Sequence, residues 1–394
     1  MTDASLPTVR TEPLGRQNDP FKDWRWQLRH ALTTATALER AIDLTSEERS
    51  GLQWAQTRGL PLLVTPYTLS LFDERNPSCP IRMQCVPREQ ERSATAGDLD
   101  DPLGEREHEV APFLIQRYPD RVLLLATTGC AINCRFCTRQ RLLRRSRGAT
   151  PLFKLGPALT WLKAHPEVRE VIVSGGDPLV ASTDRICKLL EAIRGVSSVE
   201  VIRIGTRVPC MLPLRIDDGL VAALRPFQPL WFMVHFNHPR ELTEASIGAL
   251  HKLVDGGFPV MSQTVLLRGL NDDPAILEAL FRGLVRARVR PYYLLHADVV
   301  SGTGHWRTTV ERSIELIGAL QGKLSGIALP KLVIDTPGGK GKVPVGPRTI
   351  VHLRNGGARL RTFRGEEVDV IDPFLDGLEH GSMPLVGDKR AAGG

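Results

Sequence analysis

Short apolar runs recur along the middle of the chain at a regular interval. They are rich in β-branched residues, and stretches with apolar residues at helical spacing lie between them. From the second run onward their starts lie roughly 30 residues apart, which is the length of one strand–helix repeat. Because both faces of the runs are apolar, they predict a parallel sheet covered by helices. The predicted strands lie at 122–126, 171–174, 201–204, 230–234, 260–266 and 291–295, and the predicted helices at 155–163, 184–193, 244–253 and 275–285.

Polar residues follow the carboxyl ends of these strands all round the predicted sheet. A barrel distributes its functional residues in this way, whereas an open doubly wound sheet gathers them at one switch point. We therefore expect an α/β fold built on a partial (βα)6 TIM-like barrel. The strand-end residues are Thr128, Ser174, Gly175, Gly176, Asp177, Gly205, Thr206, Arg207, His235, Gln263 and Asp298.

The segments on either side of the barrel have other patterns. Residues 1–20 are polar and without periodicity, which predicts a flexible N-terminal arm. Residues 21–110 combine helical spacing, a capping box at Thr45–Glu48 and many turn signals, so we expect a helical and irregular region that contacts another subunit. The barrel is assigned to 111–310. The remainder, 311–394, is expected to be a C-terminal segment with a glycine-rich lysine loop and a tail.

The composition narrows the class of protein. With 42% hydrophobic residues the chain can bury a large core, and disorder is excluded over most of its length. No apolar run reaches the roughly 18 residues of a membrane-spanning helix. The first residues lack the basic and apolar regions of a secretory signal, so cytoplasmic residence is expected. The net charge of +7 suits a nucleic acid or an anionic cofactor equally well.

Three of the seven cysteines crowd into one loop directly after the first predicted strand. Cys130, Cys134 and Cys137 have the spacing Cys-x3-Cys-x2-Cys, and the next cysteine along the chain is Cys187. Zinc normally takes four ligands, whereas three thiolates suit a [4Fe–4S] cluster with one iron left open. A structural zinc completed by a distant histidine and three unrelated cysteines are the alternatives.

A glycine-rich turn near the end of the predicted barrel carries two of the ten lysines. It runs from Asp335 to Lys342, and Lys340 is the second lysine. A lysine on such a turn can cradle a phosphate or form a Schiff base, although a solvated loop lysine is the simpler interpretation.

The cysteine loop at the end of the first barrel strand resembles that of the radical S-adenosylmethionine superfamily. The chain is further similar to the lysine 2,3-aminomutase family over about residues 20 to 370. The motifs that carry the similarity are Asp101–Leu103, Arg117–Leu125, Cys134–Arg139, Ser174–Leu179, Ile202–Arg207, His235–Pro239, Gln263–Leu267, Asn271–Asp272, Pro291–Tyr293 and Asp335–Lys342.

The resemblance implies a role for each candidate site residue. The three cysteines would hold the [4Fe–4S] cluster, and Lys342 would hold pyridoxal 5′-phosphate. Arg139 would bind the substrate carboxylate, while Asp298 and Asp335 would bind a side-chain ammonium group. The residues implied to contact S-adenosylmethionine are Ser174, Gly175, Gly176, Asp177, His235 and Gln263, and those on the phosphate side of pyridoxal phosphate are Arg117, Tyr118 and Arg121.

Elementary chemistry supports several of these roles. A Gly-Gly pair after a strand permits the close approach of a ligand to the backbone. Two guanidinium groups suit a phosphate dianion. Two buried acids without a cationic partner are costly, so Asp298 and Asp335 imply a basic group on the substrate.

The chain departs from the family pattern in two places. Lys340 replaces a glycine of the lysine turn, and Asp273 follows Asn271–Asp272 where family members often have a zinc-binding cysteine. Because no cysteine follows Cys210, we predict that zinc is absent. The arginines after Cys137 predict a solvated face rather than a nucleic-acid site; they are Arg141, Arg144, Arg145 and Arg147.

The expected protein is a radical S-adenosylmethionine, pyridoxal-phosphate-dependent 2,3-aminomutase. It would move the α-amino group of a free basic L-amino acid to the β-carbon and convert L-lysine to β-lysine, with arginine as the rival substrate. The family implies an external one-electron reductant and a homo-oligomer, either a dimer or a tetramer. Two other classes stay open: a radical enzyme that modifies RNA or protein, and a non-enzymatic zinc module that binds nucleic acid.

Overall fold

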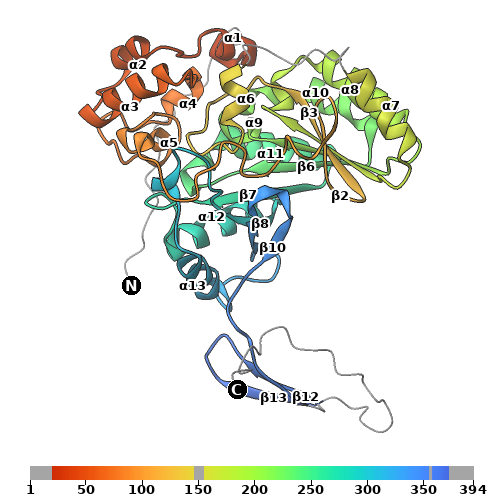
Figure 1. The fold of residues 1–394 in the computed structure, drawn as a ribbon. Coiled ribbons are helices and arrows are strands. Elements are labelled where there is room, and N and C mark those ends of the chain that lie inside the picture. Colours follow the sequence, from red (N-terminus) through yellow and green to blue (C-terminus); the bar gives the residue numbers. More distant parts are fainter. Residues whose placement is uncertain (1–19, 146–154, 355–356, 372–394) are drawn as a thin grey trace, which may run out of the picture. The chain divides into compact units, whose positions relative to one another are not determined.

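The computed structural model describes residues 20–145, 155–354 and 357–371. Ten strands form one mixed sheet in sequential order from β1 to β10 (Figure 1). The seven strands from β3 to β9 are parallel, and antiparallel strands flank them at both edges. The strands are β1 (Glu109–Ala111), β2 (Leu114–Tyr118), β3 (Arg121–Thr127), β4 (Glu170–Gly175), β5 (Val201–Thr206), β6 (Leu230–His235), β7 (Val260–Leu266), β8 (Arg290–His296), β9 (Lys331–Asp335) and β10 (Lys342–Pro344).

All six predicted strands form where the apolar runs placed them. The strand order is linear, so the described strands make an open, partial barrel, and the predicted fold class is confirmed. The parallel series continues one strand beyond the prediction, to β9. Its apolar run, Leu332–Ile334, is too short to stand out beside the longer strands.

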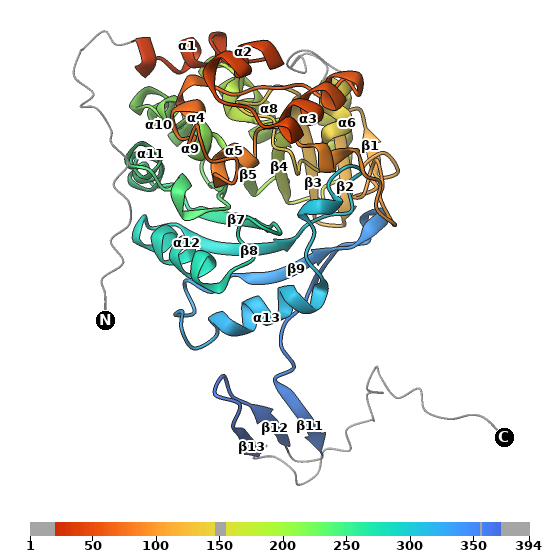
Figure 2. The same cartoon turned by 90° about the vertical axis from the view of Figure 1, so that its left-hand side faces the viewer.

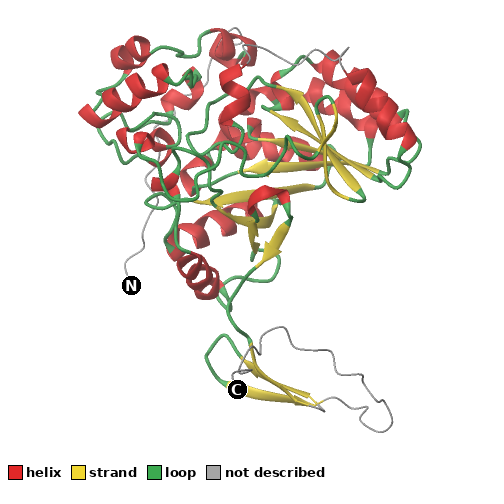
Figure 3. Cartoon of the chain, in the orientation of Figure 1, coloured by secondary structure: helices red, strands yellow, loops and turns green. Residues whose placement is uncertain are grey.

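Helices cover the outer face of the parallel strands (Figures 2 and 3). Most begin at a residue whose side chain accepts a hydrogen bond from the first turn, as Ser182 does for α8 and Thr243 for α11. Buried leucine and isoleucine side chains of these helices join the main hydrophobic core. The helices are α6 (Gln140–Arg145), α7 (Gly156–Ala164), α8 (Thr183–Arg194), α9 (Val208–Met211), α10 (Asp218–Leu224), α11 (Glu244–Asp255), α12 (Pro274–Arg286) and α13 (Val310–Leu320).

A region of short helices precedes the sheet. The predicted capping box is present: the Thr45 hydroxyl accepts from the Glu48 amide at 3.2 Å, and the Glu48 carboxylate accepts from the Thr45 amide at 2.8 Å. Glu48 also forms a fully buried ion pair with Arg82, at 2.6 Å. The helices are α1 (Trp24–Arg29), α2 (Ala35–Ala41), α3 (Ser46–Thr57), α4 (Pro66–Ser70) and α5 (Pro80–Met83).

The described residues divide into two compact units after Val345. The second unit is a three-stranded antiparallel sheet of β11 (Ile350–Arg354), β12 (Gly357–Arg361) and β13 (Glu367–Ile371). The predicted N-terminal arm up to residue 19, Arg147 and the tail from residue 372 lie outside the described residues.

No helix among residues 20–145, 155–354 and 357–371 combines the length and the apolar character that a membrane crossing requires.

Candidate active site

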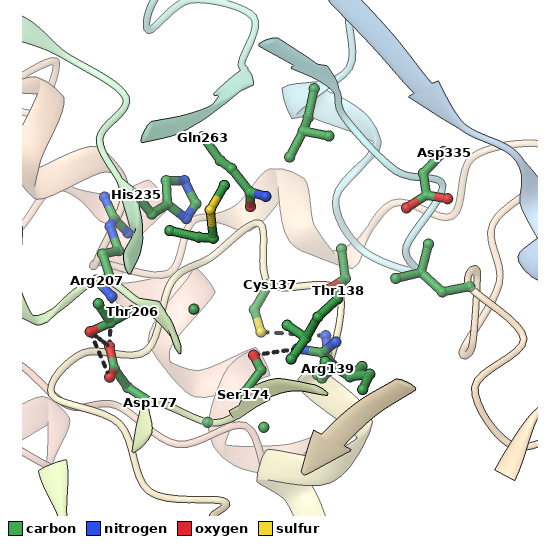
Figure 4. A pocket seen from close by; sticks show the side chains of 18 of the residues that line it. Cys137, Thr138, Arg139, Ser174, Asp177, Thr206, Arg207, His235, Gln263 and Asp335 are labelled. Carbon is green, nitrogen blue, oxygen red and sulfur yellow. Dashed lines mark hydrogen bonds between the residues drawn. The ribbon is translucent and has the colours of Figure 1, made fainter. Parts of the chain in front are cut away.

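One cavity of about 580 Å³ opens at the carboxyl ends of the barrel strands, and every predicted site residue lines it (Figure 4). The residues come from β2, β3, β4, β6, β7, from the loops after β3 and β8, and from the end of β9 and the turn after it. Folding therefore brings together positions that lie more than 200 residues apart, such as Arg117 and Lys342.

The cysteine loop is held between the N-terminal region and the sheet. Its Arg135 amide donates to the Gln84 carbonyl at 3.0 Å, and the Arg135 guanidinium forms a buried ion pair with Glu91. The Asn133 amide reaches the Leu63 carbonyl at 3.4 Å. The region 21–110, expected to contact another subunit, thus also anchors the loop that carries the cysteines.

The absence of side chains at Gly175 and Gly176 lets the backbone of residues 127–129 pass close to them. A Cβ atom on Gly176 would stand 2.2 Å from the Gly129 carbonyl oxygen, and one on Gly175 would stand 2.3 Å from that of Thr127. Gly175 also has φ +120°, where only glycine is comfortable. The close approach that the Gly-Gly pair permits is therefore that of the cysteine loop, and not only that of a ligand as we argued from the sequence.

The three cysteine thiols fit a cluster of several irons. Burial, together with the neighbouring Cys134, raises the pKa of Cys137 to about 11, and burial and Cys137 also raise the pKa of Cys130. Such thiols ionise together only beside strong positive charge, which ferric ions supply. A four-iron cluster takes each thiolate on a different iron, and all three cysteines line the cavity.

Arg207, which we did not assign a role from the sequence, contacts this cysteine loop. Its Nη1 donates to the Cys134 sulfur at 2.8 Å, and its Nη2 pairs with Glu241 at 2.8 Å and with Gln84 at 2.5 Å. All three partners are remote in sequence, so their contacts with Arg207 could not be predicted. The only sequence indication for Arg207 was its place in the Ile202–Arg207 motif at a strand end.

Asp177 is already fully engaged within the protein. Its carboxylate accepts from the Thr206 hydroxyl at 2.8 Å and from the amides of Arg207 and Leu179 at 2.6 and 3.1 Å (Figure 4). Burial raises its pKa, although these donors oppose the shift. Asp177 thus shapes the turn after β4, while the neighbouring Ser174 side chain faces the cavity.

His235, the last residue of β6, lies beside Gln263 of β7. We expected Gln263 at the end of its strand, but it is in the middle of β7, because β7 continues to Leu266. The His235 Nε2 atom lies 2.9 Å from the Asn237 side-chain oxygen. Burial, with the charge of Arg207, lowers the pKa of His235 to about 4, so the ring is neutral at pH 7. Both side chains offer polar, uncharged groups to the cavity.

Asp335 at the end of β9 already has cationic partners. Its Oδ1 accepts from Arg117 at 2.5 Å, and its Oδ2 pairs with the Lys342 ammonium. Burial would raise the pKa of Asp335, but Arg117 and Lys342 outweigh it and hold the pKa below its usual value. Our argument that both acids lack a cationic partner is therefore wrong for Asp335.

Asp298 is the acid to which that argument applies. Within the described residues its carboxylate has neither an ion pair nor a hydrogen bond. Burial raises its pKa to about 7, with the charge of Asp335 adding to the shift. A cation that entered the cavity here would stabilise the ionised form.

Tyr118 and Arg121 lie close to the lysine turn. The Lys342 amide donates to the Tyr118 hydroxyl at 2.8 Å, and the Arg121 guanidinium stacks on the Tyr118 ring at 3.8 Å from its centroid. Arg121 also pairs with Asp120 at the surface. Arg117, Tyr118, Arg121 and Lys342 together give the cavity a basic wall that fits a phosphate.

Arg139 is oriented by Glu105, another residue without a role in our sequence analysis. The Arg139 Nε donates to Glu105 at 2.7 Å and its Nη1 to the Ser174 hydroxyl at 3.3 Å. Arg141, which we expected on a solvated face, is buried and donates to the second Glu105 oxygen at 2.6 Å. Glu105 follows the Asp101–Leu103 motif, and that proximity was the only sequence signal for it.

The chain is similar to known proteins over most of its length. The model of the radical SAM superfamily matches residues 124–280, and the lysine-2,3-aminomutase model matches residues 317–373. The L-lysine 2,3-aminomutase of Bacillus subtilis (strain 168) is 42% identical over 94% of this chain and 80% of its own length. The enzyme of the same name from Clostridium subterminale is 41% identical over 90% of this chain and 85% of its own.

A glutamate 2,3-aminomutase from Clostridioides difficile (strain 630) is also similar, with 32% identity over 92% of this chain and 86% of its own length. The relatives thus include two substrate classes. The two family models that match the chain, with identity above 40% over nearly its whole length, establish the family. The chain belongs to the lysine 2,3-aminomutase family of radical S-adenosylmethionine enzymes.

Proposed function

We propose that this enzyme is a pyridoxal-phosphate-dependent 2,3-aminomutase that converts L-lysine to β-lysine. The observation that carries the proposal is the half-buried Asp298, which has no ion-pair partner among the described residues and lies in the same cavity as Arg139 and Lys342. An acid that pays its burial cost without a cation is best explained by a substrate that brings one. Arg139 supplies the matching site for an α-carboxylate.

The cofactors would be held by the residues that line this cavity. Cys130, Cys134 and Cys137 would hold the cluster, which with S-adenosylmethionine supplies a hydrogen-abstracting carbon radical. Lys342 would hold pyridoxal phosphate, which supplies an aldehyde that takes up an amine and a ring that delocalises an unpaired electron. The reductant that loads the cluster with an electron would be an external partner.

The two oxygens of Asp335 have different partners, which suggests how its role could change. Oδ2 pairs with the Lys342 ammonium and Oδ1 with Arg117. If Lys342 held the cofactor as a Schiff base, its nitrogen would no longer be a free ammonium group, and Oδ2 would be available to another cation. Arg117 keeps Asp335 ionised meanwhile, so Asp298 and Asp335 can share the side-chain ammonium of lysine.

The same two acids select against an acidic substrate. A glutamate side chain would place a third carboxylate beside Asp298 and Asp335, and the repulsion between these negative charges would disfavour its binding. Arginine remains compatible, because a guanidinium pairs with two carboxylates.

An anaerobic competition assay tests the proposal. The iron-reconstituted protein would receive S-adenosylmethionine, pyridoxal phosphate, a reductant, and equal amounts of lysine, arginine and glutamate. Mass spectrometry after derivatisation separates the α- and β-amino isomers. We expect β-lysine as the main product. β-Arginine would move the substrate while keeping the reaction, and cleavage of S-adenosylmethionine without any β-amino acid would refute the aminomutase assignment.

A further inference from the structure

The turn Asp101–Glu105 touches both ends of the candidate substrate site. We propose that Glu105 is a positioning residue, which fixes the guanidinium of Arg139 so that its Nη atoms receive the substrate carboxylate. This inference rests on the proposed function, in which Arg139 binds that carboxylate.

Glu105 binds the Nε side of the Arg139 guanidinium, which leaves the Nη side toward the cavity. The carboxylate accepts from Nε at 2.7 Å, while Nη1 donates to the Ser174 hydroxyl at 3.3 Å. Nη2 has no hydrogen-bond partner among the described residues. A guanidinium presents two parallel donors to a carboxylate, so fixing Nε aims the Nη pair at one place in the cavity.

Arg141 makes it possible for Glu105 to orient Arg139 without cancelling its charge. It donates to the second Glu105 oxygen at 2.6 Å and lies 3.4 Å from Asp101. Glu105 is buried, with its side chain 3% exposed, and Arg141 with 8%. Arg139 and Arg141 carry two positive charges against the one negative charge of Glu105, and Asp101 pairs with Arg141 rather than with Arg139, so Arg139 keeps attraction for an incoming anion.

The same turn is tied to the lysine loop at its other end. The Gly338 amide donates to the Pro102 carbonyl at 2.9 Å. A Cβ atom on Gly339 would stand 2.5 Å from the Leu103 carbonyl oxygen, and Gly339 has φ +74°, so the contact needs glycine. The turn therefore sets Arg139 in relation to the segment that ends at Lys342.

An equilibrium binding experiment on the holoenzyme separates positioning from general damage. L-Lysine and 1,5-diaminopentane are titrated separately in the presence of S-adenosylmethionine, and binding is followed by the absorbance of pyridoxal phosphate. The diamine keeps both amino groups of lysine but lacks the carboxylate. For Glu105→Gln we expect lysine to bind about ten- to hundredfold more weakly, the range for a lost charge-assisted hydrogen bond, and the diamine to bind as to the wild type.

The matched control is Glu107→Gln, which makes the same charge change two residues further on at an exposed position. It should leave both affinities unchanged. The proposal is overturned if Glu105→Gln weakens both ligands equally, or neither of them. If Glu105→Gln does not fold, Glu105→Asp keeps the charge but shortens the reach, and the same selective loss is expected.

Failure of the proposed function would be seen in the wild type itself. A wild-type enzyme that neither binds lysine nor forms a β-amino acid would refute both the function and the inference. A wild type that is active and a Glu105→Gln variant with unchanged lysine affinity would refute the inference alone.

Discussion

At the scale of single residues, the two acids of the cavity differ in their partners. Asp335 is neutralised by Arg117 and Lys342. Asp298 is instead shielded from water and lies near the negative charge of Asp335, and it has no cationic partner among the described residues. Burial and charge thus keep the pKa of Asp298 near 7 and that of Asp335 low. The two aspartates therefore differ in how readily they ionise, although their side chains are the same.

This difference predicts how substrate affinity depends on pH. Below pH 7 the Asp298 carboxyl is protonated before substrate binds, and it must release its proton before it pairs with an ammonium group. We expect lysine affinity to fall by about tenfold for each pH unit below 7 and to level off above it. Affinity measured between pH 5.5 and 8.5 checks this. Asp298→Asn should bind weakly and lack the slope; an equal slope in the variant would assign the titration to another group.

At the scale of elements, the turn after β4 and the cysteine loop fit together through glycine backbones. Gly176 lies against Gly129, and the Gly176 amide donates to the Thr127 carbonyl at 2.5 Å. The strand end therefore sets the position of the loop that carries Cys130. Backbone atoms cannot move aside as a side-chain tip can, so this contact tolerates no added carbon.

Gly176→Ala should accordingly impair cluster binding. The added methyl group would meet the Gly129 carbonyl at 2.2 Å, and the cysteine loop would have to shift. We expect a clear loss of bound iron and sulfide per chain after reconstitution. Gly248→Ala is the control, because a Cβ atom there meets nothing within 4 Å and the site is inside helix α11. It should keep the cluster and stabilise the helix by about 0.5–1 kcal/mol. Full cluster content in Gly176→Ala would contradict the steric argument.

The N-terminal helices depend on one buried ion pair. Glu48 caps α3 and pairs with Arg82, and neither side chain is exposed to solvent. Arg82 also donates to the carbonyls of Asp43 and Glu74, so it links three segments.

Glu48→Gln should destabilise this region by about 3–5 kcal/mol, because it leaves a buried guanidinium without its counter-charge. Denaturant unfolding followed by tryptophan fluorescence measures the change. Glu47→Gln, at an exposed position on the same helix, should change the free energy of unfolding by less than about 0.5 kcal/mol. Equal effects of the two substitutions would argue against the ion pair as the cause.

At the scale of the whole molecule, a buried polar network joins the N-terminal region, the cysteine loop and the barrel. Arg207 is at its centre and contacts Gln84, Cys134 and Glu241. The Asn237 side chain extends it by donating to Gln84 at 2.9 Å. The surroundings of the proposed cluster site thus include Gln84, which comes from the region before the barrel.

Arg207→Gln should make the cluster harder to reduce. A positive charge beside a ligand sulfur favours the more negative, reduced state of a cluster, so its removal shifts the reduction potential to more negative values. A redox titration followed by electron paramagnetic resonance measures the shift. Arg225→Gln, at an exposed position, should leave the potential unchanged. An unchanged potential in Arg207→Gln, with the cluster intact, would show that the contact is purely structural.

Part of the fold and of the candidate site could be predicted from the sequence, and part could not. The apolar runs predicted six barrel strands at their observed places, because strand and helix periodicity are local properties of the chain. The short strand β9 was not predicted, because its five residues are too few to show a clear apolar run. The site residues were found through motif resemblance, and folding brings all of them to one cavity. That resemblance did not reveal Glu105 or Arg207, whose partners lie far away in sequence.

The sequence by itself determined the spacing of the three cysteines, the order of strands and helices, and the family. Each depends on residues that are close along the chain or on a pattern that can be matched without coordinates. Only the tertiary structure decided that Asp335 is paired while Asp298 is not, that Gly176 packs against Gly129, and that Arg141 is buried. Ion pairing, close packing and burial depend on which remote segments meet, and so they exist only once the chain has folded.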